Sequence, residues 1–409
     1  MRTTRTTGLM LATGLATLAL LQPAMALDAE AFVDRIEAVY EVMGYDLSFG
    51  AATLDGDTVT VDGVTVAIVG LPEESYAFDT ELTFTGVVEH EDGSYTATRL
   101  TVPDVDTQFA TDPAGHLTLT GMVAEDLYLP PAGETGAEHL LQTVGRVATG
   151  PLSITRDGVE VVAFESTEIT SEFTHNDDDT LAGIVSNLAI SGIWADLSTV
   201  KDEEPEAGAI IEALGLTEID GDITQVLNWT MGDGHLVVEE FLFDFTDVGA
   251  LNITADISGF TPAVLDKIYA MQASELDPAS EEAQAQQMML GMELLQALSI
   301  TSAVIRYDDA SLAPKLLDLF AAQSGTDRAS FVEGLKTTVP AMVGEAGIPA
   351  LTDIVVPAVN AFLDDPQSFE IAVRPPNPTS LLVLSAAAAN PAGLISAIGL
   401  SVTANQPAQ

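Results

Sequence analysis

The side chains in this chain that are best able to do chemistry are five histidines and 62 acidic residues. No two histidines show the HxxxH or HExxH spacing by which one helix presents a zinc site. The chain has no cysteine, so the thiolate ligands of most structural zinc sites are absent too. The sequence therefore predicts no metal centre and no cofactor. The histidines stand far apart, at His90, His116, His139, His175 and His235.

Two acid-rich stretches resemble calcium loops only in composition. "HNDDDT" (175–180) and "DGDTVTVDG" (55–63) lack the alternating acids and the distal glutamate of an EF-hand. The first predicts a solvated turn, with opportunistic calcium binding as the alternative. The GxSxG and Walker patterns of common enzymes are also missing, and no SxxK occurs together with its supporting motifs. We therefore expect a protein that is not an enzyme.

The strongest candidate for a binding site is apolar. In "HLVVEEFLFDFTDVGALNITADISGF" (235–260), apolar and polar residues alternate, which is typical of strands with one apolar face. A turn at 247–249 would bring the apolar faces of two adjacent strands to the same side of the sheet. The predicted ligand-binding residues are Phe241, Phe243, Phe245, Leu251, Ile253 and Ile257.

An apolar patch of this size needs a cover, and the sequence offers two. One is the protein's own helix predicted at 278–298, which carries Met288, Met289, Met292 and Leu295 on one side. The other is a lipid chain. A methionine stripe at helical spacing is more often core than binding site, so we expect the helix to be the cover.

The elements that must position this patch are mainly strands. From Leu47 to about Phe260 the apolar residues recur with a period of two. Asp62-Gly63, Asp92-Gly93 and Asp157-Gly158 predict tight hairpin turns. A weak repeat ending in Ser/Thr-Gly, such as "LTLTG" at 117 and "LAISG" at 188, indicates a meander whose glycines ease bends.

Helices are predicted at the beginning of this region and after it. The first covers 28–43, with Asp28 as its cap, and several amphipathic helices follow residue 260. The predicted fold is α+β: a long, twisted, mainly antiparallel sheet with helices packed on it. The expected division is a helix-plus-sheet part at 27–260 and a helix-rich part at 261–409, with a few strands.

The N-terminus has the pattern of a secretory signal peptide over residues 1–26. Arg2 and Arg5 precede an apolar run, and Ala24 and Ala26 form a small-x-small cleavage site. We therefore expect export to the periplasm. The apolar run is too short for a permanent anchor. The uncharged tail at 375–409 is broken by Asn390-Pro391, so we expect it to pack on the protein rather than span a membrane.

The charge of the chain excludes several classes of partner. The formal net charge is −49, and loss of Arg2 and Arg5 with the signal peptide would make it −51. Nucleic acid and anionic lipid headgroups would be repelled. Such acidity is typical of proteins that stay soluble in salt, or of proteins that bind cations or basic ligands. Because the acids are spread over the whole chain, we favour the first interpretation.

Three stretches carry a resemblance to known families. "GHLVVEEFLFDFTDVGALNITADISG", "IRYDDASLAPKLLDLFAAQSG" and "FLDDPQSFEIAVRPPNP" resemble uncharacterised exported proteins of Gram-negative bacteria. The pattern D-x-G-x-L-x-I-x-A, in which a turn leads into a strand, is more distantly similar to AsmA-like envelope proteins. That likeness implies a curved sheet whose apolar concave face handles lipids. This chain is shorter than the long lipid-bridging members and lacks a retained anchor.

Together, these observations predict a non-enzymatic periplasmic envelope protein that binds a lipid or another hydrophobic ligand in an apolar groove of its sheet. The alternative is a structural or protein-interaction module whose apolar face is filled by its own helices. In the first case the expected partner is a lipid, and in the second an envelope protein.

Overall fold

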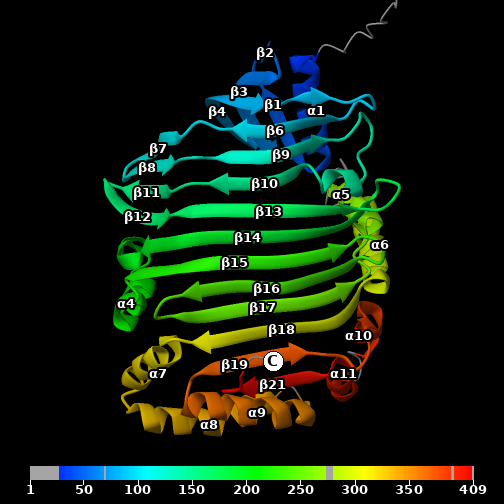
Figure 1. Ribbon diagram of the computed structural model, residues 1–409. Helices are drawn as coiled ribbons and strands as arrows, with labels where there is room; N and C mark the ends of the chain where they lie inside the picture. The colour runs from blue at the N-terminus through cyan, green and yellow to red at the C-terminus, as the bar shows by residue number, and fades with distance from the viewer. Residues whose placement is uncertain (1–26, 69–70, 273–279, 346, 388–390, 408–409) are drawn as a thin grey trace, which may run out of the picture.

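The computed structural model describes residues 27–68, 71–272, 280–345, 347–387 and 391–407. The predicted signal peptide and its cleavage residues, Ala24 and Ala26, lie outside this part. The dominant feature is one antiparallel sheet (Figure 1). The predicted α+β class is confirmed, and most of the helical residues follow residue 260.

Most strands form a meander in which neighbours in the chain are also hydrogen-bonded neighbours in the sheet. The two edge strands at the N-terminal end both pair with the third strand, and from there the order is sequential. In spatial order the strands are β1 (Tyr45–Phe49) with β2 (Ala52–Asp55), β3 (Thr58–Ile68), β4 (Leu71–Thr85), β6 (Tyr95–Thr101), β9 (Val123–Leu129), β10 (Val144–Thr149), β13 (Ser166–His175), β14 (Leu181–Asp196), β15 (Glu218–Thr230), β16 (His235–Phe245), β17 (Gly249–Ser258), β18 (Ser299–Asp309), β19 (Ser368–Val373) and β21 (Leu400–Ala404).

Four further strands lengthen the sheet on one side. They continue β6, β9, β10 and β13 beyond a short interruption, and they pair with one another in the same order. They are β7 (Val105–Thr111), β8 (Ala114–Leu119), β11 (Leu152–Arg156) and β12 (Val159–Phe164). Two short strands, β5 (Val88–Glu89) and β20 (Thr379–Ser380), pair with β6 and β18.

The helices lie at the ends of the strands and at the two ends of the sheet (Figure 1). In Figure 1, α4 and α7 stand at one end of the strands, and α5, α6 and α10 at the other. None of the helices that the structure describes has both the length and the apolar character needed to cross a bilayer. The helices are α1 (Ala29–Val42), α2 (Ala137–Leu140), η1 (Leu197–Thr199), α3 (Val200–Glu203), α4 (Pro205–Leu214), α5 (Pro262–Gln272), α6 (Glu281–Ala297), α7 (Leu312–Gln323), α8 (Arg328–Gly344), α9 (Pro349–Asp364), α10 (Leu381–Ala387) and α11 (Pro391–Ile398).

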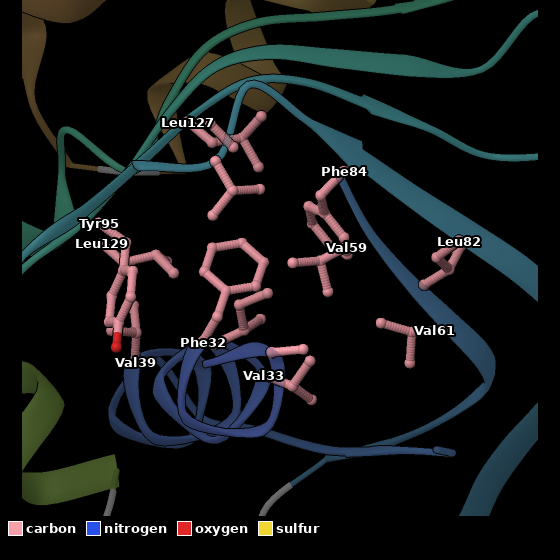
Figure 2. Packing of buried hydrophobic residues seen from close by; sticks show 14 of the residues in the cluster. Phe32, Val33, Val39, Val59, Val61, Leu82, Phe84, Tyr95, Leu127 and Leu129 are labelled. Atoms are coloured by element: carbon pink, nitrogen blue, oxygen red, sulfur yellow. The ribbon is translucent and has the colours of Figure 1, made fainter. Parts of the chain in front are cut away.

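The first helix forms as predicted and builds the main core. The Asp28 carboxylate accepts hydrogen bonds from the backbone N–H groups of Glu30 and Ala31, which caps α1. Phe32 is almost fully buried, and its ring meets Phe84 of β4 edge to face, with centroids 5.2 Å apart. Figure 2 shows this face of α1 packed against the first strands of the sheet.

The predicted hairpin turn at Asp62-Gly63 is wrong. Both residues lie inside the continuous strand β3, where the pairing with β4 is shifted at this point. Gly63 has φ +83°, so it forms a bulge that lets β1 and β2 pair with the two halves of β3. By contrast, Asp157-Gly158 is a two-residue turn between β11 and β12 with both φ values positive, as a type I′ turn requires.

Candidate ligand-binding face

The six residues predicted to bind a ligand lie on one face of β16 and β17. Phe243 stands directly opposite Leu251, and directly opposed residues in an antiparallel pair share a face. The rings of Phe241 and Phe243 lie 4.6 Å apart, centroid to centroid. The connecting turn falls at 246–248, one residue earlier than predicted, since Phe245 pairs with Gly249. The remaining three, Phe245, Ile253 and Ile257, follow by strand alternation.

The register carries this face across most of the sheet. We call it the apolar face and define it by three cross-strand rows of directly opposed residues. The first row is Phe84, Leu100, Ala124, Val147, Ile169, Leu188, Gln225 and Phe241. The second row is Ile190, Ile223, Phe243, Leu251, Tyr307, Phe369 and Ala404. The third row is Ile253, Ile305, Ile371 and Val402. Only Gln225 interrupts these rows with a wholly polar side chain.

The opposite face of the same strands is polar and partly ionic. Glu125 of β9 bridges two arginines, accepting from Arg99 at 2.8 Å and from Arg146 at 2.7 Å. Arg146 also pairs with Glu168 of β13 at 2.7 Å, which extends the ladder over four strands. The two carboxylates hold the pKa of Arg146 above its usual value through hydrogen bonds. The sheet is therefore amphipathic as a whole, with one apolar and one charged surface.

The predicted cover for this face, the methionine-rich helix, does not cover it. Met288 and Met289 of α6 are 72% and 73% exposed, and α6 packs against α5, α10 and β20. The reason is topological. The segment that contains α5 and α6 connects β17 to β18. These two strands are adjacent in the sheet, with Ser258 opposite Ser299. A helical pair inserted between adjacent strands leaves and returns at the same strand ends, so it need not cross the face.

Exposure agrees with an uncovered surface over part of β18 and β19. Ile305 is 49% exposed and Ile371 42%, although both point to the apolar face. Phe241, Phe243 and Phe245 are half-buried. At the N-terminal end α1 covers the face through Phe32 on Phe84. At one end of the strands Leu265 of α5 packs into a small cluster around Trp229.

A polar cavity of about 930 Å³ adjoins this face where β13 leads into β14. Ser171 and Phe173 line it and share the side of β13 that carries Ile169, so the cavity opens beside the apolar face. The rest of its wall comes from β6, β9, β10, α2 and the neighbouring loops. The wall contains six carboxylates and two histidines but no lysine or arginine. These residues are Asp92, Asp126, Glu134, Glu138, Asp178, Asp179, His139 and His175.

Hydrogen bonds hold several of these groups in place. His175 Nε2 lies 2.6 Å from Gln142 Oε1, and His139 Nε2 lies within 3.6 Å of Glu134 and Glu138. The Thr180 hydroxyl and backbone N–H donate to Asp178 and lower the pKa of its carboxyl group. Burial raises the pKa of Tyr128 in the same wall.

The chemistry available in the cavity is electrostatic binding of a cation or of a group rich in hydrogen-bond donors. Within the described residues, no three His, Asp or Glu side chains are grouped so that they could hold a metal ion. No local pattern in the sequence indicates this cavity, because its wall is assembled from strands, loops and a short helix far apart in the chain. The only signal was the density of acids in "HNDDDT", which we assigned to a solvated turn.

Comparison with known proteins shows a similarity to one uncharacterised family over part of the chain. A family model described as an uncharacterized protein matches residues 242–405. The matched part is less than half of the chain and includes β17, β18 and β19, which carry parts of the second and third rows of the apolar face. A search of curated proteins gives no match. The chain is therefore similar, over its C-terminal part, to uncharacterised proteins, as the three quoted stretches predicted.

Proposed function

We propose that this protein is an exported, non-enzymatic envelope protein that binds a lipid or a similar amphiphile along the apolar face of its sheet. The observation that carries the proposal is the exposure of apolar side chains on this face: Ile169 of β13 is 38% exposed, Ile305 of β18 49% and Ile371 of β19 42%. At the C-terminal end of the sheet only part of the face is covered, where Phe362 of α9 packs on Phe369. Exposed apolar surfaces beyond a few hundred Å² are normally binding sites. The more distant likeness to AsmA-like proteins points to the same class of ligand.

The neighbouring cavity suits the polar end of such a ligand. An acyl chain lying on Ile169 and Phe173 would place its headgroup among the carboxylates at the end of β13. Because the wall bears six carboxylates and no lysine or arginine, a headgroup with an amine or several hydroxyls fits better than a bare phosphate or carboxylate.

The alternative function, a structural module whose apolar face is filled by its own helices, has less support. The described helices lie at the strand ends or, like α1 and α9, at the two ends of the sheet, and α6 turns its methionines to solvent. None of the closely packed pairs of elements in the described part joins a helix to β16 or β17. If the apolar face binds a protein partner and not a lipid, the following test will show no lipid binding.

Phe243→Ala should weaken binding of a fluorescent fatty acid by about tenfold or more, since one aromatic side chain contributes roughly 1.5–3 kcal/mol of apolar burial. Because the ring is half-buried, its loss should destabilise the fold by less than the ~3–5 kcal/mol of an enclosed phenylalanine. Titration and thermal melting measure the two effects. The matched control is Leu242→Ala, the next residue on the opposite face.

Two results would count against the proposal. If wild-type protein takes up neither the fatty acid nor a fluorescent long-chain alkylamine, whose headgroup suits the acidic cavity, and co-purifies with no lipid, the apolar face is not a lipid site. If Phe243→Ala costs the full ~3–5 kcal/mol, the ring is enclosed in the folded protein and the face has a cover. Export is tested separately by N-terminal sequencing of periplasmic protein, which should begin at residue 27 or 28.

A further inference from the structure

A second apolar surface lies outside the sheet, on α6 and α10. Met288, Met289 and Met292 are 72%, 73% and 46% exposed. Leu290 and Gln286 line the gap between α6 and α5, so the three methionines, at helical spacing on another side, face away from that contact. The helix α10 packs against α6 and adds two exposed residues, Leu382 and Val383. We call these five residues the α6–α10 patch.

This patch adjoins the end of the apolar face. Ile300 of β18 stands opposite Ile257, one of the six predicted ligand-binding residues. The short strand β20 pairs with Ser299 and Ile300 and continues directly into α10. The backbone N–H of Leu381 donates to the carbonyl of Leu298, which follows α6. A ligand leaving the sheet at Ile257 would thus meet α10 and the end of α6.

The charge distribution indicates what touches the patch. The chain has a net charge of −49, yet residues 375–409, which include α10, carry no charged side chain. The patch also lacks the aromatic and arginine residues that dominate the centres of protein interfaces. Methionine and aliphatic side chains adapt to irregular apolar surroundings, which suits lipid tails. An anionic bilayer would repel the acidic remainder of the molecule.

We propose that the α6–α10 patch is the surface by which this protein touches an electrically neutral bilayer and exchanges its ligand. The proposal rests on the proposed function, because it supplies the route by which an acyl chain reaches the apolar face. The contact is shallow: methionine, leucine and valine side chains enter the interface, and the helices stay on the surface.

The test measures transfer of a fluorescent fatty acid from phosphatidylcholine vesicles to the protein. In the double variant Met288→Glu/Met289→Glu, the transfer rate and co-flotation with the vesicles should fall at least about tenfold, because two carboxylates would have to approach the acyl region. Binding of the same fatty acid free in solution should stay unchanged. The matched control is Met342→Glu, since Met342 of α8 is 64% exposed and outside the patch.

The outcomes separate the two proposals. Adding phosphatidylglycerol to the vesicles should slow transfer to the wild-type protein. If the double variant transfers and floats like the wild type, or if Met342→Glu has the same effect, the patch is not the membrane contact. Capture of a defined envelope protein by the patch, without vesicle binding, would also overturn it. Failure of both the fatty acid and a fluorescent long-chain alkylamine to bind in solution would, by contrast, refute the proposed function. Co-flotation of wild type and variant would still test the patch.

Discussion

At the residue scale, Tyr307 shows how one side chain joins the apolar face to a turn. Its ring stands in the second row between Leu251 and Phe369. Its hydroxyl donates to the carbonyl of Val248 at 2.8 Å and lies 2.9 Å from the carboxylate of Asp309. The ring also lies over Gly249, where an added Cβ would stand 2.6 Å from the Tyr307 hydroxyl oxygen, so only glycine fits there. Tyr307 therefore fixes the β16–β17 turn beside the predicted binding residues.

Stability should fall above about pH 10, and Tyr307 should account for part of the loss. Burial, followed by the nearby Asp309 carboxylate, raises the pKa of Tyr307 well above its ordinary value of about 10. An unfolded tyrosine loses its proton near pH 10 while the folded one keeps it, so stability present below pH 10 is lost as the pH rises further. Tyr40, Tyr95, Tyr128 and Tyr269 are shifted in the same direction by burial.

The measurement is urea unfolding between pH 8 and pH 11. Tyr307→Phe should lower the free energy of unfolding at pH 8 by roughly 1 kcal/mol, the worth of a hydrogen bond, and should flatten its fall above pH 10. The control is Tyr45→Phe, because Tyr45 is 46% exposed. An equally steep alkaline fall in Tyr307→Phe would show that this phenol is not protected in the folded state.

At the element scale, the sheet bends along a line of interruptions. The breaks between β6 and β7, β8 and β9, β10 and β11, and β12 and β13 lie side by side, and β14 shifts register near Gly192. Gly121 and Gly192 have φ values of +65° and +63°, so the glycines of the Ser/Thr-Gly repeat supply the conformation that the bend needs. Pro103 and Pro151 stand in two of the breaks, where no backbone donor is needed.

Each of these two glycines has its N–H bonded by an aspartate of another strand or loop. Gly121 donates to Asp104 at 2.9 Å, and Gly192 donates to Asp222 at 2.8 Å. The carboxylates replace the ladder partner that the bulge removes. The bend is therefore stabilised by side chains, and the sheet curves at defined strand positions.

Asp222→Ala should destabilise the fold by about 1 kcal/mol, because the Gly192 N–H loses its acceptor. Asp222→Asn keeps an oxygen acceptor and removes repulsion from Asp244, which stands directly opposite, so it should be neutral or slightly stabilising. Thermal and urea unfolding of both variants provide the comparison. Equal losses in the two variants would contradict the hydrogen-bond role.

The edges of the sheet are protected by neighbouring helices. At the N-terminal edge, Phe49 N–H donates to Glu37 at 3.0 Å and Ala52 N–H donates to Glu30 at 3.3 Å, both carboxylates belonging to α1. At the other end, α9 packs against β21, and Asn405 donates to the carbonyl of Ala361. Unpaired strand edges invite pairing with other chains, so these contacts direct any association toward the faces.

At the scale of the whole molecule, charge is the dominant long-range property. In the described part, the ion pairs are formed mostly by the few basic residues, such as Arg146 with two glutamates and Arg306 with Asp308 and Glu370. These pairs leave the large acidic excess of the chain without partners of opposite sign. The excess is spread over the surface and acts as self-repulsion.

The melting temperature should therefore rise as salt is added, from low ionic strength to ~0.5 M, where the screening length is only a few ångström. Calorimetry of one sample across a sodium chloride series measures this. The neutral osmolyte sucrose at matched osmolality is a control for general exclusion effects. A melting temperature that stays flat or falls with salt would show that the acidic residues are compensated locally.

Local patterns in the sequence determined the element types well. The cap Asp28, the strand alternation of 235–257 and the turn Asp157-Gly158 depend on nearest neighbours along the chain, and each is found as predicted. The same local logic failed at Asp62-Gly63, because a glycine with positive φ serves a bulge as well as a turn. Which of the two forms depends on the strands that pair on either side.

Only the tertiary structure decided which apolar surfaces are covered by other elements and which are exposed. The sequence identified the apolar face on two strands, and the register of the neighbouring strands extended it across the sheet. The methionines of α6 have the pattern of a core, yet the adjacency of β17 and β18 places that helix at the strand ends. The acidic cavity arises from segments more than 80 residues apart, from Asp92 to Thr180. Periodicity records that a residue is apolar, and chain connectivity in three dimensions determines whether anything covers it.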